Sequence, residues 1–346
     1  MRFGAFVPQG WRWDLVGIPK TDHWAIISDR AALIERSGFE SLWVYDHFHN
    51  WPQGWWADHR KAVEAGESTE DMPDPVTDVT YEAWTMMAAL GAVTSTVRLG
   101  QMCTCNTYRP PSYLAKVAAT IDVFTGGRIE MGIGAGWYEE EHDGYGYPFL
   151  PPKGRLGMLR EGVEIMKAMW TQDVVDYDGE HYQLRGGMCD PKPVQSPHIP
   201  VWVAGGGEQV TLRIAARHAD YTNFGGDVET FRHKSDILRR HCEDLGTSYD
   251  RIVRSANFNI MMGETEAEVE DKISWLADSL SKVIPERRAQ RFADGYRTSS
   301  GTPEQVVENL KAWHAAGMTY AIVNFADLAY DTSSLELFAS QVIPEF

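Results

Sequence analysis

A strand pattern at residues 41–45 (SLWVY) is followed directly by an acid and an imidazole, Asp46 and His47. An imidazole exchanges protons near neutral pH, and a neighbouring carboxylate can polarise it or bind a ligand directly. The same two residues could instead cap a loop and fill the space beside it. Because the pair stands where a strand ends, we predict that His47 is catalytic and that Asp46 helps to hold the reacting ligand.

Three consecutive glycines, Gly205, Gly206 and Gly207, stand between an apolar strand pattern and a helical pattern at 208–219. Backbone N–H groups at the start of a helix bind phosphate readily, and glycines let a phosphate approach them closely. We therefore predict a phosphate cradle here, with a tight turn as the alternative. A second glycine-rich segment, residues 132–136 (GIGAG), is weaker evidence because tight turns use glycine equally often.

A polar loop, GQMCTCNTYRPP at residues 100–111, follows the strand pattern at 97–102. The side chains of Gln101, Thr104 and Asn106 can hydrogen-bond to a polar ligand. Alternatively, the loop only leads into the helix that its two prolines open.

Tryptophans gather just beyond the acid–imidazole pair. Trp51, Trp55 and Trp56 lie in a segment, 49–78, that is rich in tryptophan, proline and charge. Exposed clusters of this kind usually mark a binding surface, so we expect a lid or a wall of the substrate pocket. An insertion that packs onto itself is the alternative.

The chain has 346 residues and a formal net charge of -17. Such a chain repels nucleic acid and anionic lipid, so we expect neither as a partner. No signal-peptide pattern or long apolar run occurs, which predicts a cytoplasmic protein that is not bound to a membrane. The 4 cysteines are too few for a disulfide framework and lack metal-ligand spacing, so we expect free thiols and no metal.

Strand and helix patterns alternate along the whole chain. Strand patterns fall at residues 2–8, 41–45, 97–102, 128–136, 197–207, 220–226, 253–262 and 319–325. Helical patterns fall at 24–37, 80–94, 111–124, near 155–171, and at 208–219, 228–245, 265–281 and 302–317, and a short helix is expected at the C-terminus. This order predicts an α/β fold, a single (β/α)₈ TIM barrel over 1–346 with insertions near 49–78 and 144–196. A dinucleotide-binding sheet is disfavoured, because no glycine fingerprint follows the first strand.

Taken together, these motifs resemble the luciferase-like flavin and deazaflavin oxidoreductases, and among them the branch that depends on coenzyme F420. The resemblance extends over nearly the whole chain. It rests on SLWVYDHF, RLGQMCTCNTYRPPSYLAKVAATIDVFTGGRIEMGIGAGWYEEEH, PVWVAGGGEQVTLRIAARHAD and GTPEQVVENL. It implies a luciferase-like (β/α)₈ barrel that is often a homodimer, binds its cofactor at the C-terminal mouth and acts on a small-molecule substrate.

The resemblance also implies roles for individual residues. Asp46 and His47 match the pair beside the deazaflavin ring, and Gln101–Met102 matches a non-prolyl cis peptide behind that ring. Thr104 follows on the same cofactor-side loop.

Further matches concern the rest of the cofactor. Asn106 lies on the same loop, Gly206 and Gly207 match the phosphate-binding glycines with Gly205 in support, and Glu140 matches a cofactor-contacting amide. Where the family's sugar-phosphate dehydrogenase has a catalytic acid, this chain has Trp137. This difference disfavours a sugar-phosphate activity, and the tryptophan-rich segment 49–78 indicates a bulkier or more apolar substrate instead.

The leading hypothesis is an F420-dependent oxidoreductase that moves a hydride between the deazaflavin and an organic substrate, with His47 as proton partner. An FMN-dependent luciferase-like monooxygenase is the alternative enzyme. A cofactor carrier without turnover would need the glycine cradle but not His47, so the presence of both disfavours it.

Overall fold

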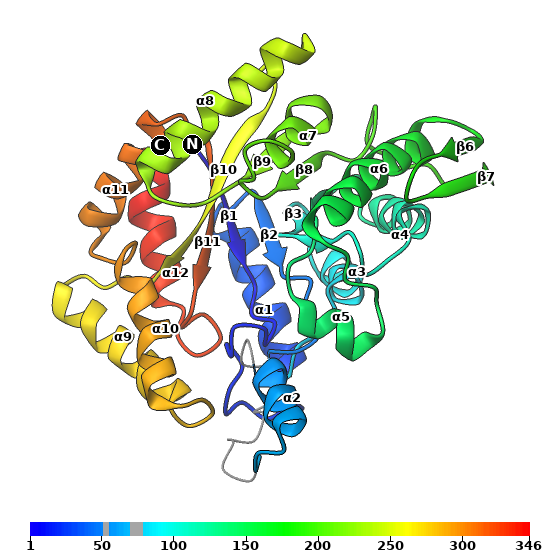
Figure 1. Cartoon of the computed structure of the whole chain (residues 1–346). Helices are drawn as coiled ribbons and strands as arrows, with labels where there is room; N and C mark the ends of the chain where they lie inside the picture. Colours follow the sequence, from blue (N-terminus) through cyan, green and yellow to red (C-terminus); the bar gives the residue numbers. More distant parts are fainter. Residues whose placement is uncertain (51–54, 70–78) are drawn as a thin grey trace.

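Eight parallel strands close into a barrel in the part of the chain that the computed structural model describes, residues 1–50, 55–69 and 79–346 (Figure 1). Each barrel strand pairs with the next in chain order, and the last pairs with the first. The predicted (β/α)₈ fold is therefore confirmed. The strands are β1 (Arg2–Phe6), β2 (Ser41–Val44), β3 (Arg98–Gln101), β5 (Ile129–Gly134), β8 (Val201–Ala204), β9 (Tyr221–Asn223), β10 (Val253–Ile260) and β11 (Tyr320–Phe325).

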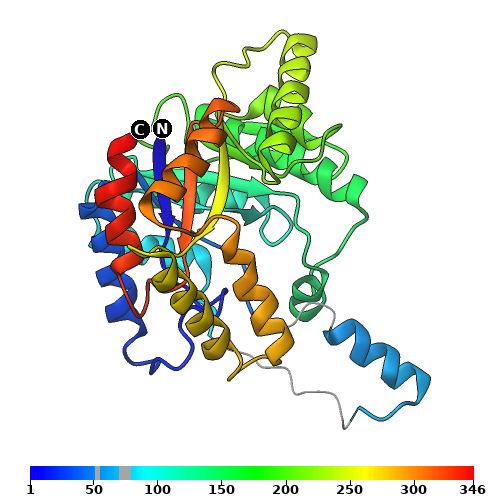
Figure 2. The same cartoon turned by 90° about the vertical axis from the view of Figure 1, so that its left-hand side faces the viewer.

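Helices follow the strands and cover the outside of the barrel (Figures 1 and 2). No helix among the described residues is long and apolar enough to cross a bilayer. The helices are α1 (His23–Arg36), α2 (Trp55–Ala65), α3 (Ala83–Val93), α4 (Pro111–Phe124), α5 (Glu139–Tyr145), α6 (Pro152–Thr171), α7 (Thr211–His218), α8 (Val228–Leu245), α9 (Glu266–Leu280), α10 (Glu286–Arg297), α11 (Pro303–Ala315) and α12 (Ser333–Leu337).

The two segments that were expected to be insertions differ in character. The first contains α2, which projects from the barrel at the end opposite the chain termini (Figure 2). The second contains α6, which packs against α4 and α7 as a helix of the barrel, and an antiparallel hairpin of β6 (Val175–Asp178) and β7 (Gln183–Gly187).

Aromatic side chains fill the inside of the barrel. Phe6, Trp43 and Trp202 are at most 2% exposed and form one cluster with Tyr320. Gly100 on the neighbouring strand makes room for this cluster, because a Cβ there would overlap the indole of Trp43. The interior is thus packed, and ligands are left to bind at a barrel end.

Local sequence signals explain several element boundaries. The helix α4 coincides with the predicted 111–124, starting at a proline and stopping before two glycines with positive φ. At the start of α11, the backbone N–H of Thr302 donates to Gln305 Oε1 at 3.0 Å, as in a capping box. The strands are mostly shorter than predicted, because the predicted segments include turn residues beside the strands, such as the glycines that follow β8 and β9.

Three helices, α2, α5 and α10, were not predicted from the sequence. The helix α10 has only a narrow buried stripe, Ala289, Ala293 and Tyr296, among mostly charged residues. The two termini meet at one barrel end, where the N-terminal ammonium donates to Phe346 O at 3.1 Å. Asp46, His47 and the three glycines lie at the other end, where the strands finish.

Candidate active site

His47 lies just beyond β2 and is held by a carboxylate from another part of the chain. Its Nδ1 is 2.8 Å from Glu141 Oε2, and no described residue bonds to its Nε2. The indole of Trp11 stacks on the imidazole with ring centroids 3.6 Å apart. Because the carboxylate accepts, the Nδ1–H tautomer fits this geometry and the lone pair of Nε2 is left for a ligand.

Glu141, on α5, is fully buried and accepts several hydrogen bonds. The hydroxyl of Tyr108 donates to it, as do the backbone N–H groups of Phe48 at 2.5 Å and His49 at 3.3 Å. Burial alone raises the pKa of Glu141, but the bonds from His47, Tyr108 and Phe48 bring this pKa below its usual value. The carboxylate is therefore ionised at neutral pH and keeps the imidazole in place.

Asp46 is buried and bonded on both carboxylate oxygens. Arg109 Nη1 and Nη2 donate to it at 2.7 and 2.9 Å, and the N–H of Cys105 donates at 2.9 Å. Removing one partner of such a buried pair typically costs about 3–5 kcal/mol of stability. In this structure Asp46 ties the loop after β3 to β2, and its contact with a cofactor stays a prediction.

A cavity of about 240 Å³ opens beside this pair. Asp46, His47, Met102 and Cys103 line it together with aromatic residues. A non-prolyl cis peptide lies here, but it joins Met102 to Cys103, one residue beyond the predicted Gln101–Met102 bond. Burial raises the pKa of the Cys103 thiol to about 12, so this side chain is no thiolate nucleophile at neutral pH.

Three other predicted residues are buried and do not line the cavity. Gln101, Thr104 and Asn106 are at most 1% exposed. The Thr104 hydroxyl donates to Gln101 Oε1, and Asn106 Nδ2 donates to the hydroxyl of Tyr182 at 3.4 Å. Gln101 Nε2 and Asn106 Oδ1 have no partner in the described structure. Their cofactor contacts stay predictions, as does that of half-buried Glu140 on α5.

The glycine segment after β8 fits an anion. Gly205 has a φ of +116°, and its N–H donates to Asn223 O at 2.9 Å. The N–H groups of Gly206 and Gly207 have no partner among the described residues. A Cβ at Gly206 would overlap Lys234 Nζ, and one at Gly207 would lie 2.8 Å from a Thr211 oxygen. Two free N–H groups beside an ammonium suit a phosphate.

Lys234, on α8, was not predicted from the sequence. Among the described residues, no carboxylate lies within ion-pairing distance of its ammonium. The lysine is 27 positions beyond the glycines in a helix of mixed charge, so nothing in its local sequence indicated the contact.

A comparison with known protein families gives a match over most of the chain. The model of the luciferase-like monooxygenase family matches residues 1–320. The chain belongs to that family. It is accordingly an enzyme of the luciferase-like oxidoreductases, with its cavity and glycine cradle at the barrel mouth where the family fold leaves room for ligands.

Relatives of this luciferase-like chain differ in cofactor. It is 36% identical over 190 residues to an uncharacterised protein of Mycobacterium tuberculosis, a match that spans 55% of this chain and 64% of that protein. It is 28% identical to an F420-dependent glucose-6-phosphate dehydrogenase of Nocardia farcinica, over 85% and 86% of the two chains. It is 27% identical to an FMNH₂-dependent dimethylsulfone monooxygenase of Pseudomonas putida, over 68% and 70%.

Solved structures show the same fold. An F420-dependent secondary alcohol dehydrogenase in complex with an F420–acetone adduct superimposes with a TM-score of 0.74 at 19% identity, over 99% and 98% of the two chains. The monooxygenase RslO1 from Streptomyces bottropensis gives 0.75 at 19% identity, over 99% of each chain. At these identities the likeness concerns the barrel alone.

Several residues of the candidate site were missed besides Lys234. Trp11 stands in a loop whose sequence shows no special pattern, whereas Tyr108 and Arg109 lie in the polar loop 100–111 but were not singled out there. Glu141 belongs to the quoted GWYEEEH motif, but the motif does not say which acid meets His47. Trp51 lies outside the described residues, and so do the side chains of Trp55 and Trp56.

Proposed function

We propose that this enzyme is an F420-dependent oxidoreductase that transfers a hydride between the deazaflavin and an organic small molecule. The observation that carries this proposal is His47, whose Nδ1 is bound by a buried carboxylate while its Nε2 is left without a partner among the described residues beside the cavity. A hydride transfer to or from a carbonyl or alcohol needs a proton to move as well, and a tautomer held in this way can move it.

Different residues of the chain would bind the cofactor and position the imidazole. When bound, F420 supplies a carbon centre that gives or takes a hydride in two-electron chemistry. Gly206, Gly207 and Lys234 are suited to hold its phosphate. Trp11 and Tyr138 pack around His47, with ring centroids of 3.6 and 5.8 Å from it, and so help to fix the plane of the imidazole.

The substrate side of the cavity is aromatic. Trp137, at the position of the acid in the family's sugar-phosphate dehydrogenase, is 53% exposed and stacks on Tyr138 with centroids 5.2 Å apart. An indole surface favours an apolar or aromatic substrate over a sugar phosphate.

An FMN-dependent monooxygenase is the second candidate function. The observation that favours it is the similarity to the FMNH₂-dependent monooxygenase, together with a cradle that a phosphate monoester can occupy equally well. In that case the enzyme would consume oxygen when supplied with reduced flavin.

The deciding experiment is a titration of the purified protein with F420 and with FMN, followed by fluorescence quenching. We expect F420 to bind much more tightly, and a Gly206→Asp variant to lose that binding. Equal or reversed affinities, or oxygen uptake with reduced FMN, would overturn the assignment to F420.

We further propose that the enzyme is a cytoplasmic homodimer. Support comes from its net charge of -17, which opposes binding to anionic surfaces, and from the dimers common in the family. Light scattering coupled to size-exclusion chromatography tests the dimer, because a monomeric mass at micromolar concentration contradicts it.

A further inference from the structure

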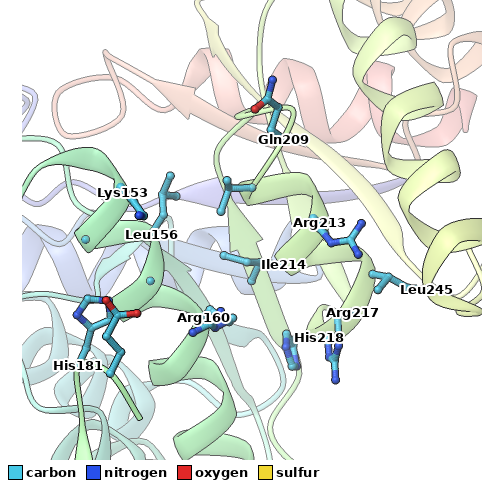
Figure 3. Close-up of a pocket in the computed structure, with 14 residues that line it drawn as sticks. Lys153, Leu156, Arg160, His181, Gln209, Arg213, Ile214, Arg217, His218 and Leu245 are labelled. Carbon is cyan, nitrogen blue, oxygen red and sulfur yellow. The ribbon is translucent and has the colours of Figure 1, made fainter.

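A groove of about 720 Å³ lies between α6 and α7, outside the barrel and apart from the cavity beside His47 (Figure 3). Leu156, Ile214 and Leu245 form its apolar part. Basic side chains surround this part from both helices. The neighbouring helices thus leave a ligand-sized opening on the outside of the barrel.

The charge of this groove is opposite to that of the chain as a whole. Lys153 and Arg160 line it from α6, and Arg213 and Arg217 line it from α7. Among the described residues that line it, Glu180 is the one carboxylate, in a chain with a net charge of -17.

The cations of the groove are poorly neutralised. In the described structure no carboxylate lies within ion-pairing distance of Lys153, Arg213 or Arg217, and Arg160 has only Glu161 at 3.4 Å. Two arginines at positions i and i+4 of one helix repel each other. Unpaired like charges on both walls indicate that a polyanion is the missing partner.

The groove begins where the phosphate cradle ends. Gln209 and Val210 line the groove and follow Gly207 within three positions in the chain. Lys153 lies at the same end of the groove as Gln209 (Figure 3). A ligand whose phosphate sits on Gly206 and Gly207 can therefore continue along the groove if it carries something beyond that phosphate.

The two candidate cofactors differ at this point. The phosphate of FMN is a monoester, so the molecule ends there. The phosphate of F420 is a diester that continues into a chain of γ-linked glutamates, with a carboxylate on each. Carboxylates pair with guanidinium groups in a bidentate manner, which suits a groove lined by arginines rather than by lysines alone.

We propose that the groove between α6 and α7 binds the oligoglutamate chain of F420, with Arg213 and Arg217 as its main contacts. This inference rests on the proposed use of F420. The groove then contributes to the choice of cofactor, because FMN has no group that reaches it.

The test compares F420 carrying five or more glutamates with its form lacking glutamate. The wild-type protein should bind the long form about tenfold more tightly, as expected for two exposed charge pairs. Arg213→Gln/Arg217→Gln should lose this preference. The matched control is Arg287→Gln/Arg291→Gln, an exposed pair at the same spacing on α10 that should keep it.

Two measurements on the wild-type protein test the same proposal without depending on whether the variants fold. Free γ-linked pentaglutamate should weaken the binding of long-tailed F420, and raising the salt concentration should reduce the tail preference. If both forms bind equally well at low salt and the peptide does not compete, the groove has no such role although F420 remains the cofactor. If neither form binds while FMN does, the proposed function itself fails.

Discussion

The two ends of the proposed cofactor site are built in different ways. At the cradle, Gly206 and Gly207 are consecutive, and they offer backbone N–H groups with one added ammonium from Lys234. Around His47, the working groups are side chains from separate segments, with Glu141 on α5 as the central acceptor. Backbone N–H groups can bind an anion but cannot exchange a proton near neutral pH, whereas an imidazole can exchange one.

This difference predicts that binding and turnover can be separated by mutation. Changes at the cradle should act on the cofactor dissociation constant, and changes around His47 should act on kcat. Four substitutions test that division, in order of decreasing effect.

His47→Ala should have the largest effect. Loss of a general acid–base group typically lowers turnover by roughly 10²–10⁴. Cofactor affinity should change little, since the proposed phosphate cradle lies after β8, which β3 and β5 separate from β2 around the barrel. Steady-state kinetics and a pH–rate profile that loses one limb are the measurements. Wild-type turnover with an unchanged profile would show that His47 moves no proton.

Gly206→Asp should act in the opposite way. The new side chain overlaps the position of Lys234 Nζ and places a negative charge against the phosphate. We expect about 100-fold weaker cofactor binding, as for other like-charge contacts in a binding site. Gly295→Asp is the control, because Gly295 is exposed on α10 with no atom near its Cβ position. Unchanged affinity in a folded Gly206→Asp protein would place the phosphate elsewhere.

Glu141→Gln should lower turnover about tenfold. This loss is smaller than the one expected for His47→Ala, because the imidazole is still present. An amide can donate to Nδ1 and so favour the wrong tautomer of His47. Because the pKa of Glu141 is lowered in the folded state, its stabilising effect is complete above about pH 4.3 and is lost as the pH falls through the lower folded pKa.

Unfolding experiments on Glu141→Gln check that sign. The stability difference from wild type should be constant from about pH 6 to 8 and should shrink below about pH 4. A difference that grows as the pH falls would mean that Glu141 is protonated in the native protein.

Lys234→Gln should have the smallest effect. A partly exposed ammonium contributes up to about 1 kcal/mol to an ion pair, so cofactor binding should weaken about fivefold with kcat unchanged. The loss should fade at high salt. Lys282→Gln, on an exposed lysine outside the cradle, is the control. A fall in kcat without a change in affinity would contradict the division between the two ends.

Much of the frame was predictable because it is encoded locally. The alternation of strands and helices follows from apolar periodicity, and α4 ends where consecutive glycines allow positive φ. Since parallel barrel strands all finish at one end, the positions of His47 and the glycines just after their strands were enough to predict that they share the barrel mouth. The helix α10 was not predicted, because its buried residues are too few among charged ones to give a periodic apolar pattern.

The sequence by itself determined the barrel, the position of His47 at its mouth and the glycines after β8, because each depends on neighbours within a few residues. Only the tertiary structure decided that His47 is hydrogen-bonded to Glu141, which lies 94 positions further along the chain. The same holds for the ion pair in which Arg109 donates to the carboxylate of Asp46. Each step along a helix turns a side chain by about 100°, so the packing of α5 selects one acid from Glu139, Glu140 and Glu141. Side-chain partners far apart in the chain depend on such rotations, which no local pattern records.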